Sequence, residues 1–385
     1  MAEQAGVPLL TAYQALRSQG EIGAAVHERV RQAADAQGYT LRITLRDVAA
    51  LAGVSVSTVS YVLHDSPLIN AQTRHRVQDA IAALGYHPNS TARNLKASES
   101  RLIGYAWHKV QDPVQRNPIL DRFLYELAQS SEASGYHVLT FAPSTADGAE
   151  SYTDLIRTSR VDGFVLSDTT YQDPRMRRLQ DLRIPFACFG RADAGWDFPY
   201  ADDDGHRGVG MVVEHLLSQG HTQIAMLGWP EGNAVGDTRV RGYRDALAAR
   251  GLEAHEGWLA RTPNDVTHAT QAAEAVLAHR PSPTAVICAT DIMTLGVRVC
   301  LERAGLKLGD DVVVASYDDS PIAAALGLTS VHQNIESIAR AVTDLLLAEI
   351  QGRPLVHRHV LVEPSLVVRA SSSAALARRI GQTAT

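Results

Sequence analysis

Cysteines and long hydrophobic runs are scarce in this 385-residue sequence. Its three cysteines, Cys188, Cys288 and Cys300, lie in apolar surroundings without the spacing of metal ligands, which argues against a disulfide framework or a zinc site. No run of about eighteen apolar residues could span a membrane, and roughly the first twenty residues lack the basic start, apolar block and cleavage site of an export signal. We therefore expect a cytoplasmic protein with reduced, buried cysteines.

Catalytic motifs are missing as well. The sequence has no G-x-S-x-G elbow, no G-x-x-x-x-G-K loop and no H-E-x-x-H pair, and its 15 histidines are scattered. The stretch GHRGVG from Gly205 to Gly210 does not match the dinucleotide-binding pattern G-x-G-x-x-G, and we interpret it as part of a helix. The sequence therefore predicts a protein that is not an enzyme and needs no cofactor or metal.

Charge is distributed unevenly along the chain, although the net charge is -6. Between residues 41 and 101 the basic residues outnumber the acidic ones. The basic residues are Arg42, Arg46, Arg74, Arg76, Arg93, Lys96 and Arg101, and the acidic ones are Asp47, Asp65, Asp79 and Glu99. A small basic head on an acidic body is typical of a nucleic-acid-binding module joined to a different domain.

A helix-turn-helix pattern begins at Thr44. This residue is a good N-cap for a first helix ending at Ala52, and Gly53 suits the left-handed turn that follows. Ser55 can cap a second helix, which starts with short uncharged side chains that could enter the major groove of DNA closely. A third helix, from Ala71 to Leu84, is predicted to pack behind the other two.

A short polar stretch follows this head. After Pro88 the chain reads NSTARNLKAS, which can form one or two helical turns capped by Asn89 but is too short to be stable alone. The segment 44–98 resembles the headpiece and hinge of the LacI/GalR family of transcriptional regulators in turn, spacing and hinge, and a looser resemblance continues to about Arg369. In that family the hinge helix orders only on operator DNA, where a leucine separates a base step in the minor groove. The matching residue is Leu95.

The resemblance implies a set of DNA-binding positions. They are Thr44, Ser55, Val56, Ser57, Thr58, Tyr61, Asn70, Thr73 and Tyr86 in the head, and Asn89, Ala92, Leu95 and Lys96 in the hinge. Asn70 and Thr73 match phosphate contacts, and Tyr86 closes the head. Many family members carry an arginine that can contact guanine where this chain has Tyr61, and tyrosine cannot make that bidentate contact. We expect a different operator preference, unless Tyr61 is only a packed residue on the helix surface.

Residues 1–43 repeat the pattern of this head. A shift of about 47 residues aligns the two without a gap, and about fourteen of roughly forty positions are identical where composition would give roughly three. Matched pairs include Ala5 to Val7 with Ala52 to Val54, Thr11 with Thr58, Leu16 with Leu63, Ile22 with Ile69, and Val30 with Val77. We interpret residues 1–43 as a degenerate second copy, with a first helix cut short by Met1. The alternative is coincidence between two alanine-rich helical stretches.

The copy differs from the head where DNA would be read. Pro8 stands in the place of Ser55 and Leu10 in the place of Ser57. Loss of both hydroxyls predicts a weak or absent base reader, with a role in packing or residual phosphate contact.

Beyond residue 101, apolar strands alternate with amphipathic helices. We expect strands at 102–107, 137–142, 163–167, 186–189, 224–228, 285–289 and 312–317, and helices that include 119–134, 206–219, 240–250, 266–279 and 293–303. Continuous apolar strands separated by helices predict parallel sheets buried on both faces, and the length fits two such lobes. The family resemblance implies this two-lobed, periplasmic-binding-protein-like α/β fold, with crossings near residues 200, 332 and 362.

Polar residues stand at the ends of several expected strands, where ligands of parallel sheets bind. Asp291, Asp318 and Asp319 follow two of the strands, and Arg239 begins the helix after another. Carboxylates and a guanidinium around one cleft suit a polyhydroxylated ligand. The resemblance implies effector binding by Arg239, Asp291 and Asp318, although Thr290 stands where family members often carry asparagine. The alternative for Asp318 and Asp319 is capping of the following helix. We favour capping for Asp319 and ligand binding for Asp318.

Other residues near the expected cleft allow two interpretations each. The cluster from Asp202 to Asp204 precedes a helix, and we interpret it as N-terminal capping rather than a metal site. Trp107, Phe189 and Trp229 could stack on a sugar or pack in the core, and we nominate Trp229 for the site. Asn117 is nominated because the first-lobe loop of the family approaches the effector there.

These assignments predict five regions along the chain. They are a degenerate helix-turn-helix repeat (1–43), an all-α headpiece (44–88), a hinge helix and linker (89–100), a two-lobed effector-binding and dimerisation domain (101–372) and a flexible tail (373–385). Lobe 1 takes about 101–200 and 333–361, and lobe 2 about 201–332 and 362–372.

The resemblance implies a homodimeric, sequence-specific repressor of transcription. It would bind a pseudo-palindromic operator and be released allosterically by a sugar or related small molecule. The alternative is a cytoplasmic sugar-binding protein or sugar-processing enzyme with an accessory helical domain. Against that alternative, we find neither an export signal nor a general acid and base pair.

Overall fold

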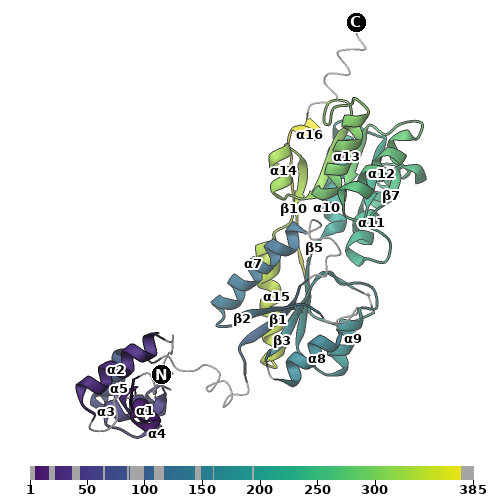
Figure 1. The fold of residues 1–385 in the computed structure, drawn as a ribbon. Helices are drawn as coiled ribbons and strands as arrows, with labels where there is room; N and C mark the ends of the chain where they lie inside the picture. The colour runs from purple at the N-terminus through teal and green to yellow at the C-terminus, as the bar shows by residue number, and fades with distance from the viewer. Residues whose placement is uncertain are drawn as a thin grey trace. The chain divides into compact units, whose positions relative to one another are not determined.

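The computed structural model describes residues 5–16, 22–36, 44–63, 66–84, 86, 99–107, 117–143, 149–158, 160–192 and 195–373. The chain divides into two compact units, residues 1–97 and residues 98–385 (Figure 1). The hinge positions Asn89, Ala92, Leu95 and Lys96 lie outside the described residues, as does the tail from residue 374.

The headpiece folds as the three expected helices, α3 (Leu45–Ala52), α4 (Val56–Leu63) and α5 (Ala71–Leu84). Both the backbone N–H and the hydroxyl of Thr44 donate to the carboxylate of Asp47, at 2.7 and 2.6 Å, so the first helix is capped as predicted. Gly53 takes the left-handed conformation, with a φ of 61°. Val48, Val59 and Val77, one from each helix, form a fully buried core.

Two further helices, α1 (Leu9–Leu16) and α2 (Ala24–Ala36), belong to the same unit. They bury a core of their own around Ala12 and Val30, which is separate from the core of the headpiece.

Residues 98–385 form two lobes, each built on a six-stranded sheet (Figure 1). The first sheet has the order β11-β5-β4-β3-β1-β2, and all its strands run parallel. Its strands are β1 (Leu102–Ala106), β2 (His137–Phe141), β3 (Gly163–Leu166), β4 (Phe186–Phe189), β5 (Tyr200–Asp203) and β11 (His359–Val362). Helices α7 (Pro118–Ala133) and α15 (Ile335–Ile350) cover one face, and α8 (Ala149–Arg157) and α9 (Pro174–Asp181) cover the other.

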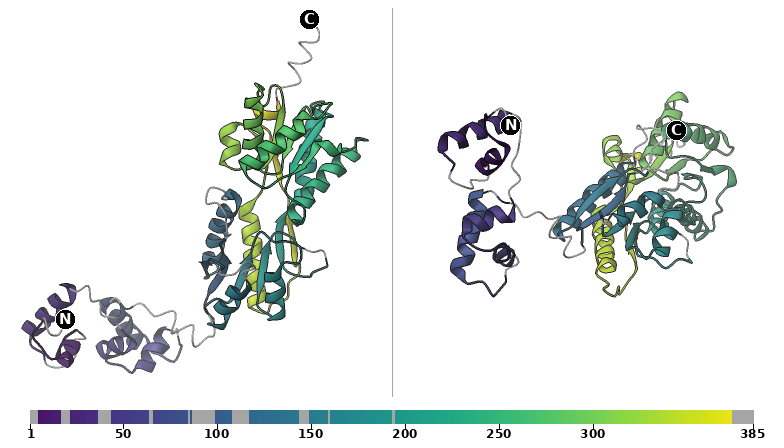
Figure 2. Two further views of the ribbon diagram at one scale, coloured as in Figure 1. Left: turned by 45° about the vertical axis from the view of Figure 1, so that its right-hand side comes forward. Right: turned by 60° about the horizontal axis from the view of Figure 1, so that its bottom comes forward.

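The second sheet has the order β12-β10-β9-β8-β6-β7, and only the edge pair β10 and β12 is antiparallel. Its strands are β6 (Ile224–Gly228), β7 (Leu259–Arg261), β8 (Ala285–Cys288), β9 (Val313–Asp318), β10 (Thr329–His332) and β12 (Ser365–Val367). The helices of this lobe are α10 (Gly205–Ser218), α11 (Ala234–Ala248), α12 (Val266–Ala278), α13 (Asp291–Arg303), α14 (Pro321–Leu326) and α16 (Ala370–Ser373), with a short 3-10 turn, η1 (Glu256–Trp258). The two lobes lie end to end in Figure 1 and in the left view of Figure 2.

The chain passes from one sheet to the other after β5, after β10 and after β11. The crossings expected near residues 332 and 362 coincide with the ends of β10 and β11. The crossing expected near residue 200 lies a few residues later, because β5 completes the first sheet through Asp203. Five short strands that the sequence did not predict, β5, β7, β10, β11 and β12, build the sheet edges and the crossings.

The three cysteines are buried and free, as expected from their apolar surroundings. Within the described ranges, no helix has the length and apolar character needed to cross a membrane.

Candidate functional site

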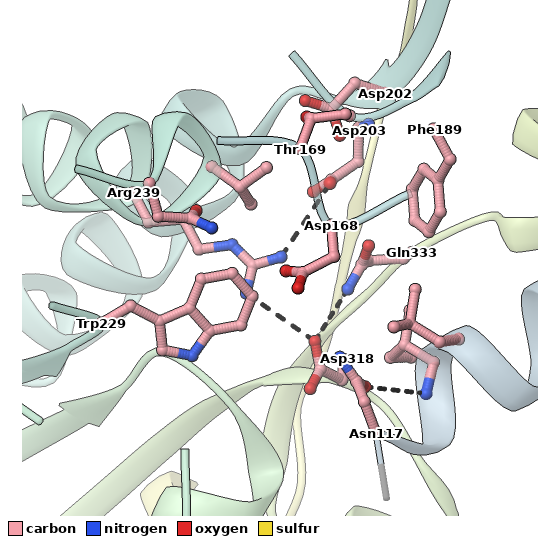
Figure 3. Close-up of a pocket in the computed structure, with 15 residues that line it drawn as sticks. Asn117, Asp168, Thr169, Phe189, Asp202, Asp203, Trp229, Arg239, Asp318 and Gln333 are labelled. Atoms are coloured by element: carbon pink, nitrogen blue, oxygen red, sulfur yellow. Dashed lines mark hydrogen bonds and ion pairs between the residues drawn. The ribbon is translucent and has the colours of Figure 1, made fainter. Parts of the chain in front are cut away.

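Residues from both lobes line a cavity (Figure 3). The first lobe contributes Asn117, Ile119, Leu120, Asp168, Thr169, Phe189, Gly190, Asp202 and Asp203, and the rest of the chain contributes Trp229, Asn233, Val235, Arg239, Asp318 and Gln333. Several of these residues stand at or just after the carboxyl ends of strands β3, β4, β6, β9 and β10. The cavity therefore lies where parallel sheets place their ligands.

Arg239 is the central cation of this pocket. Its side chain is only 2% exposed, and its Nη1 donates to the carbonyl oxygen of Ala289 at 2.7 Å. The guanidinium carbon lies 3.6 Å from the ring centroid of Tyr317 and 5.3 Å from that of Trp229. Burial lowers the pKa of the guanidinium, but Tyr317 and the neighbouring carboxylates raise this pKa above its ordinary value. Arg239 is therefore held as a charged group in a protein interior.

Asp203 joins the two lobes. It ends β5 in the first lobe, and it accepts a hydrogen bond from the hydroxyl of Tyr317, which belongs to β9 of the second lobe. Its Oδ1 also lies 3.9 Å from Nη2 of Arg239. A buried carboxylate thus links a tyrosine and an arginine of the opposite lobe.

Asp202, the preceding residue, points to a different partner. Its Oδ2 accepts from Nε of Arg191 at 2.9 Å. Burial and the neighbouring Asp203 carboxylate raise the pKa of Asp202 to about 7, and Arg191 opposes this rise. This carboxyl group therefore titrates near neutral pH.

Asp318 lies on the second-lobe side of the pocket. Its Oδ1 accepts from Nε2 of Gln333 at 2.7 Å and lies 3.7 Å from Nη1 of Arg239. Burial raises its pKa well above the ordinary value, against the opposing charge of Arg239. Its φ of 108° is costly for a residue with a side chain, and such strain is concentrated at functional sites.

Aromatic and amide side chains complete the walls. Trp229 lines the cavity, and its buried indole N–H has no hydrogen-bond partner among the described residues. Phe189 lines the cavity from the first lobe and stacks on Phe123, with ring centroids 4.5 Å apart. Asn117 caps α7 by accepting from the N–H of Ile119 at 3.1 Å, and it also faces the cavity (Figure 3).

Four nominated effector positions, Asn117, Trp229, Arg239 and Asp318, are therefore brought together, but the fifth is not. Asp291 accepts from the hydroxyls of Ser316 and Ser330 and from the N–H of Ser320, and it does not line the cavity. Its carboxylate ties β9, β10 and the start of α14 to α13.

Two predictions of local structure near the pocket are wrong. Arg239 does not begin a helix, because Asn233 caps α11 and places Arg239 inside its second turn. Asp319 does not cap α14. Ser320 does so, while Asp319 pairs with Arg369 and His332.

The prediction that the cluster from Asp202 to Asp204 caps a helix holds for only one of its three residues. Only Asp204 caps α10, by accepting from the N–H of Arg207 at 3.1 Å. Asp202 and Asp203 line the cavity instead. No group of three or more metal-ligating side chains occurs in the described part of the chain.

Sequence reasoning missed Asp168, Thr169, Asn233 and Gln333 as lining residues. A signal was available for the first two, because SDT directly follows the apolar strand β3. Gln333 follows β10, an unexpected strand, and so offered no such signal.

The described lining of the pocket contains more acidic than basic side chains. Four of the described lining residues are carboxylic acids and one, Arg239, is a cation, although the raised pKa values of Asp202 and Asp318 reduce the negative charge. Acceptors therefore predominate, and an arriving phosphate or carboxylate would face like charges. Neutral hydroxyl groups can donate to these carboxylates without that repulsion.

In the headpiece, the start of α4 is available for a partner. Ser55, Val56 and Ser57 are exposed, and Tyr61 is 51% exposed, so it is not a packed residue in the described unit. Oγ of Ser55 accepts from the N–H of Thr58 at 3.1 Å, which confirms the predicted cap. Figure 1 shows α4 among the helices of this unit.

The remaining head positions have structural partners as well. Asn70 caps α5 by accepting from the N–H of Thr73 at 2.8 Å, and Tyr86 is buried against the head core. The proposed phosphate contact of Asn70 is compatible with this cap, because capping uses its amide oxygen and a phosphate would accept from its NH2 group.

Comparisons with known proteins agree with both units. Residues 44–89 match the bacterial regulatory proteins of the lacI family, and residues 213–372 match the periplasmic binding protein-like domain. The HTH-type transcriptional repressor PurR of Vibrio campbellii (strain ATCC BAA-1116) is 31% identical over 340 residues, which are 85% of this chain and 97% of that protein.

Two solved structures are similar over most of the chain. The lac repressor dimer bound to operator and the anti-inducer ONPF has a TM-score of 0.73 and 26% identity, and it matches 87% of this chain and 100% of its own. The transcriptional regulator CelR in complex with cellobiose has a TM-score of 0.67 and 28% identity, and it matches 86% of this chain and 100% of its own.

Proposed function

Because this chain belongs to the lacI family of bacterial regulatory proteins, we propose that it is a transcriptional repressor released from its operator by a neutral, polyhydroxylated effector. The observation that carries the choice of effector is the acidic pocket around Arg239. The similar CelR structure holds cellobiose, a neutral sugar, which supports the same class of ligand.

The site residues follow from the pocket geometry. Asp203 and Asp318 would accept hydrogen bonds from ligand hydroxyls, and Trp229 would supply a ring face and its unpartnered N–H. Asn117 and Phe189 would contact the ligand from the first lobe. A ligand that contacts residues of the first lobe and residues of the second lobe at the same time would draw the two lobes together.

Closure of the lobes would be transmitted to the DNA-binding unit through residues 89–100. These residues lead directly into β1, which lies inside the first sheet. We propose that two chains form a homodimer, as in the lac repressor dimer bound to operator, and place two headpieces on a pseudo-palindromic site. In the hinge helix, which Asn89 would cap, Leu95 would enter the minor groove of the operator. Ala92 and Lys96 would contact the DNA beside it.

The effector class can be tested on an operator selected from random DNA. Neutral sugars and their phosphate esters are compared as matched pairs for release of labelled operator. A phosphate placed about 5.5 Å from one pocket carboxylate costs about 3 kcal/mol at an effective dielectric constant of about 20, so we expect a preference of at least about 100-fold for the neutral member. Equal or stronger release by the phosphate ester would contradict the proposed effector class.

Operator and effector binding should also be linked. If the effector weakens the operator by a given factor, operator DNA must weaken the effector by the same factor. Calorimetric titration of the effector with and without saturating operator measures this directly. Two identical affinities would rule out release by an allosteric effect.

A further inference from the structure

We infer that residues 5–36 are a second copy of the headpiece that has kept the turn and the last two helices and lost the DNA-reading chemistry, so that each chain reads its operator with one head. The two regions have the same helices after a shift of 47 residues, the distance from Leu9 to Val56 and from Ala24 to Ala71. On this shift α1 falls on α4 from end to end, and α2 falls on α5 with its last residue one position short.

The same positions are buried in both copies. Ala5, Ala12, Ala15, Val30 and Ala33 form the core of the first copy, and they fall on Ala52, Val59, Val62, Val77 and Ala80 in the core of the second. The partly buried residues Val7, Leu16 and Ile22 fall on Val54, Leu63 and Ile69, which are partly buried as well. Two unrelated alanine-rich segments would not share a core position by position.

The turn before the second helix of the motif is also shared. Gly6 has a φ of 65° and Gly53 a φ of 61°, so both take the left-handed conformation that the tight turn requires. The first helical hydrogen bond is repeated too, from Ala12 to Pro8 at 3.0 Å and from Val59 to Ser55 at 3.1 Å. The backbone of the turn and of the two helices after it is thus shared between the copies, and the first copy lies outside the family match at residues 44–89.

Two of the hydroxyls that would face DNA are not shared, although Thr11 keeps the hydroxyl of Thr58. Ser55, which caps α4 through its hydroxyl, is replaced by Pro8, and Ser57 is replaced by Leu10. Proline and leucine side chains offer no donor or acceptor to a base edge or a phosphate.

The phosphate-binding positions are lost in the same way. Asn70, whose side chain caps α5, is replaced by Gly23, and Thr73 is replaced by Val26. Every polar side chain at these four positions has therefore disappeared from the copy, while the core beneath them remains.

Charge separates the copies as well. In residues 1–43, Arg17, Arg29, Arg31 and Arg42 are balanced by Glu3, Glu21, Glu28 and Asp35. In residues 44–98, Arg46, Arg74, Arg76, Arg93 and Lys96 outnumber Asp47, Asp65 and Asp79. A neutral module lacks the electrostatic attraction that supplies nonspecific affinity for DNA. A dimer would therefore carry four head-like folds but occupy two half-sites.

A matched pair of core variants tests this inference, which rests on the proposed operator binding. Val30 and Val77 occupy the same position in the two copies, and both are fully buried. In the full-length chain, V77D should weaken binding to a selected operator at least about 100-fold, because a charge in this core unfolds the reading head. V30D should change the affinity by less than about threefold. A loss of tenfold or more in V30D would overturn the inference.

Hydrogen exchange on the same proteins separates the folding of each copy from its contribution to operator binding. Amides of α2 should be protected in the wild type and exposed in V30D, with α5 protected in both. Unprotected α2 amides in the wild type would overturn the claim that the copy is folded. If instead no protein, wild type included, selects an operator while α2 is protected, the proposed repressor function fails and the duplicated fold stands.

Discussion

Arg239→Met is expected to leave operator binding in place and to abolish release by the effector. The guanidinium lies between Asp203 and Asp318, and it stacks on Tyr317. Without this cation the pKa of Asp318 rises further, because Arg239 is the charge that opposes that rise, so the pocket loses its guanidinium donor and Asp318 is held neutral. We expect the effector concentration needed for release to rise at least about 100-fold, measured by anisotropy of labelled operator. Release at the wild-type concentration would contradict the role of Arg239.

The same variant should lower the free energy of unfolding by about 3–5 kcal/mol, because it leaves buried charges without a partner. Loss of response must therefore be separated from loss of fold. Arg369→Met is a suitable control. Arg369 donates to Asp319 and to the carbonyl oxygen of Leu328 in the same lobe but does not line the cavity. It should lose stability and keep the wild-type release concentration.

The headpiece could be predicted in detail because its signals are local. Thr44, the N-cap of α3, bonds to Asp47 only three residues away, and the left-handed turn depends on Gly53 alone. The third helix has the bounds that its periodicity predicts, Ala71–Leu84. Each of these features is determined by residues within one turn of the position concerned, so a single sequence contains the necessary information.

The pocket could be predicted only in part, because its partners are distant in sequence. Three adjacent aspartates have the same local context, yet Asp204 bonds 3 residues away, Asp202 bonds 11 residues away and Asp203 bonds 114 residues away. Local reasoning explains only the first of these. Arg239 and Asp318 were found because each follows an apolar strand, and Asp291 was nominated for the same reason although serines satisfy its carboxylate. Position at a strand end therefore identifies candidates without identifying their partners.

We propose that Asp203 and Tyr317 connect recognition of the ligand with movement of the lobes. Their hydrogen bond is buried and spans the two sheets, and Arg239 contacts both residues. A ligand that binds Arg239 or Asp203 must therefore alter a bond between the lobes. Such a change would act on the first sheet at β5, and β4 and β3 separate this strand from β1 and the linker.

Asp202 should make the stability of the protein depend on pH. Its pKa is about 7 in the folded protein, against an ordinary value of 3.8, because it is buried beside Asp203. Between about pH 4 and pH 7 the folded state therefore holds a proton that the unfolded state has lost. Stability is highest at the acidic end of this window and falls as pH rises, by up to about 4 kcal/mol for this group.

Asp202→Asn is expected to remove that share of the pH dependence, because the amide does not titrate. The free energy of unfolding in urea should then fall less steeply between pH 5 and pH 8 than in the wild type. A residual slope remains, since burial also raises the pKa values of Asp291 and Asp318. Asp344→Asn, at an exposed position of α15, should keep the wild-type slope. An unchanged slope in Asp202→Asn would mean that Arg191 keeps the Asp202 carboxylate ionised throughout this range.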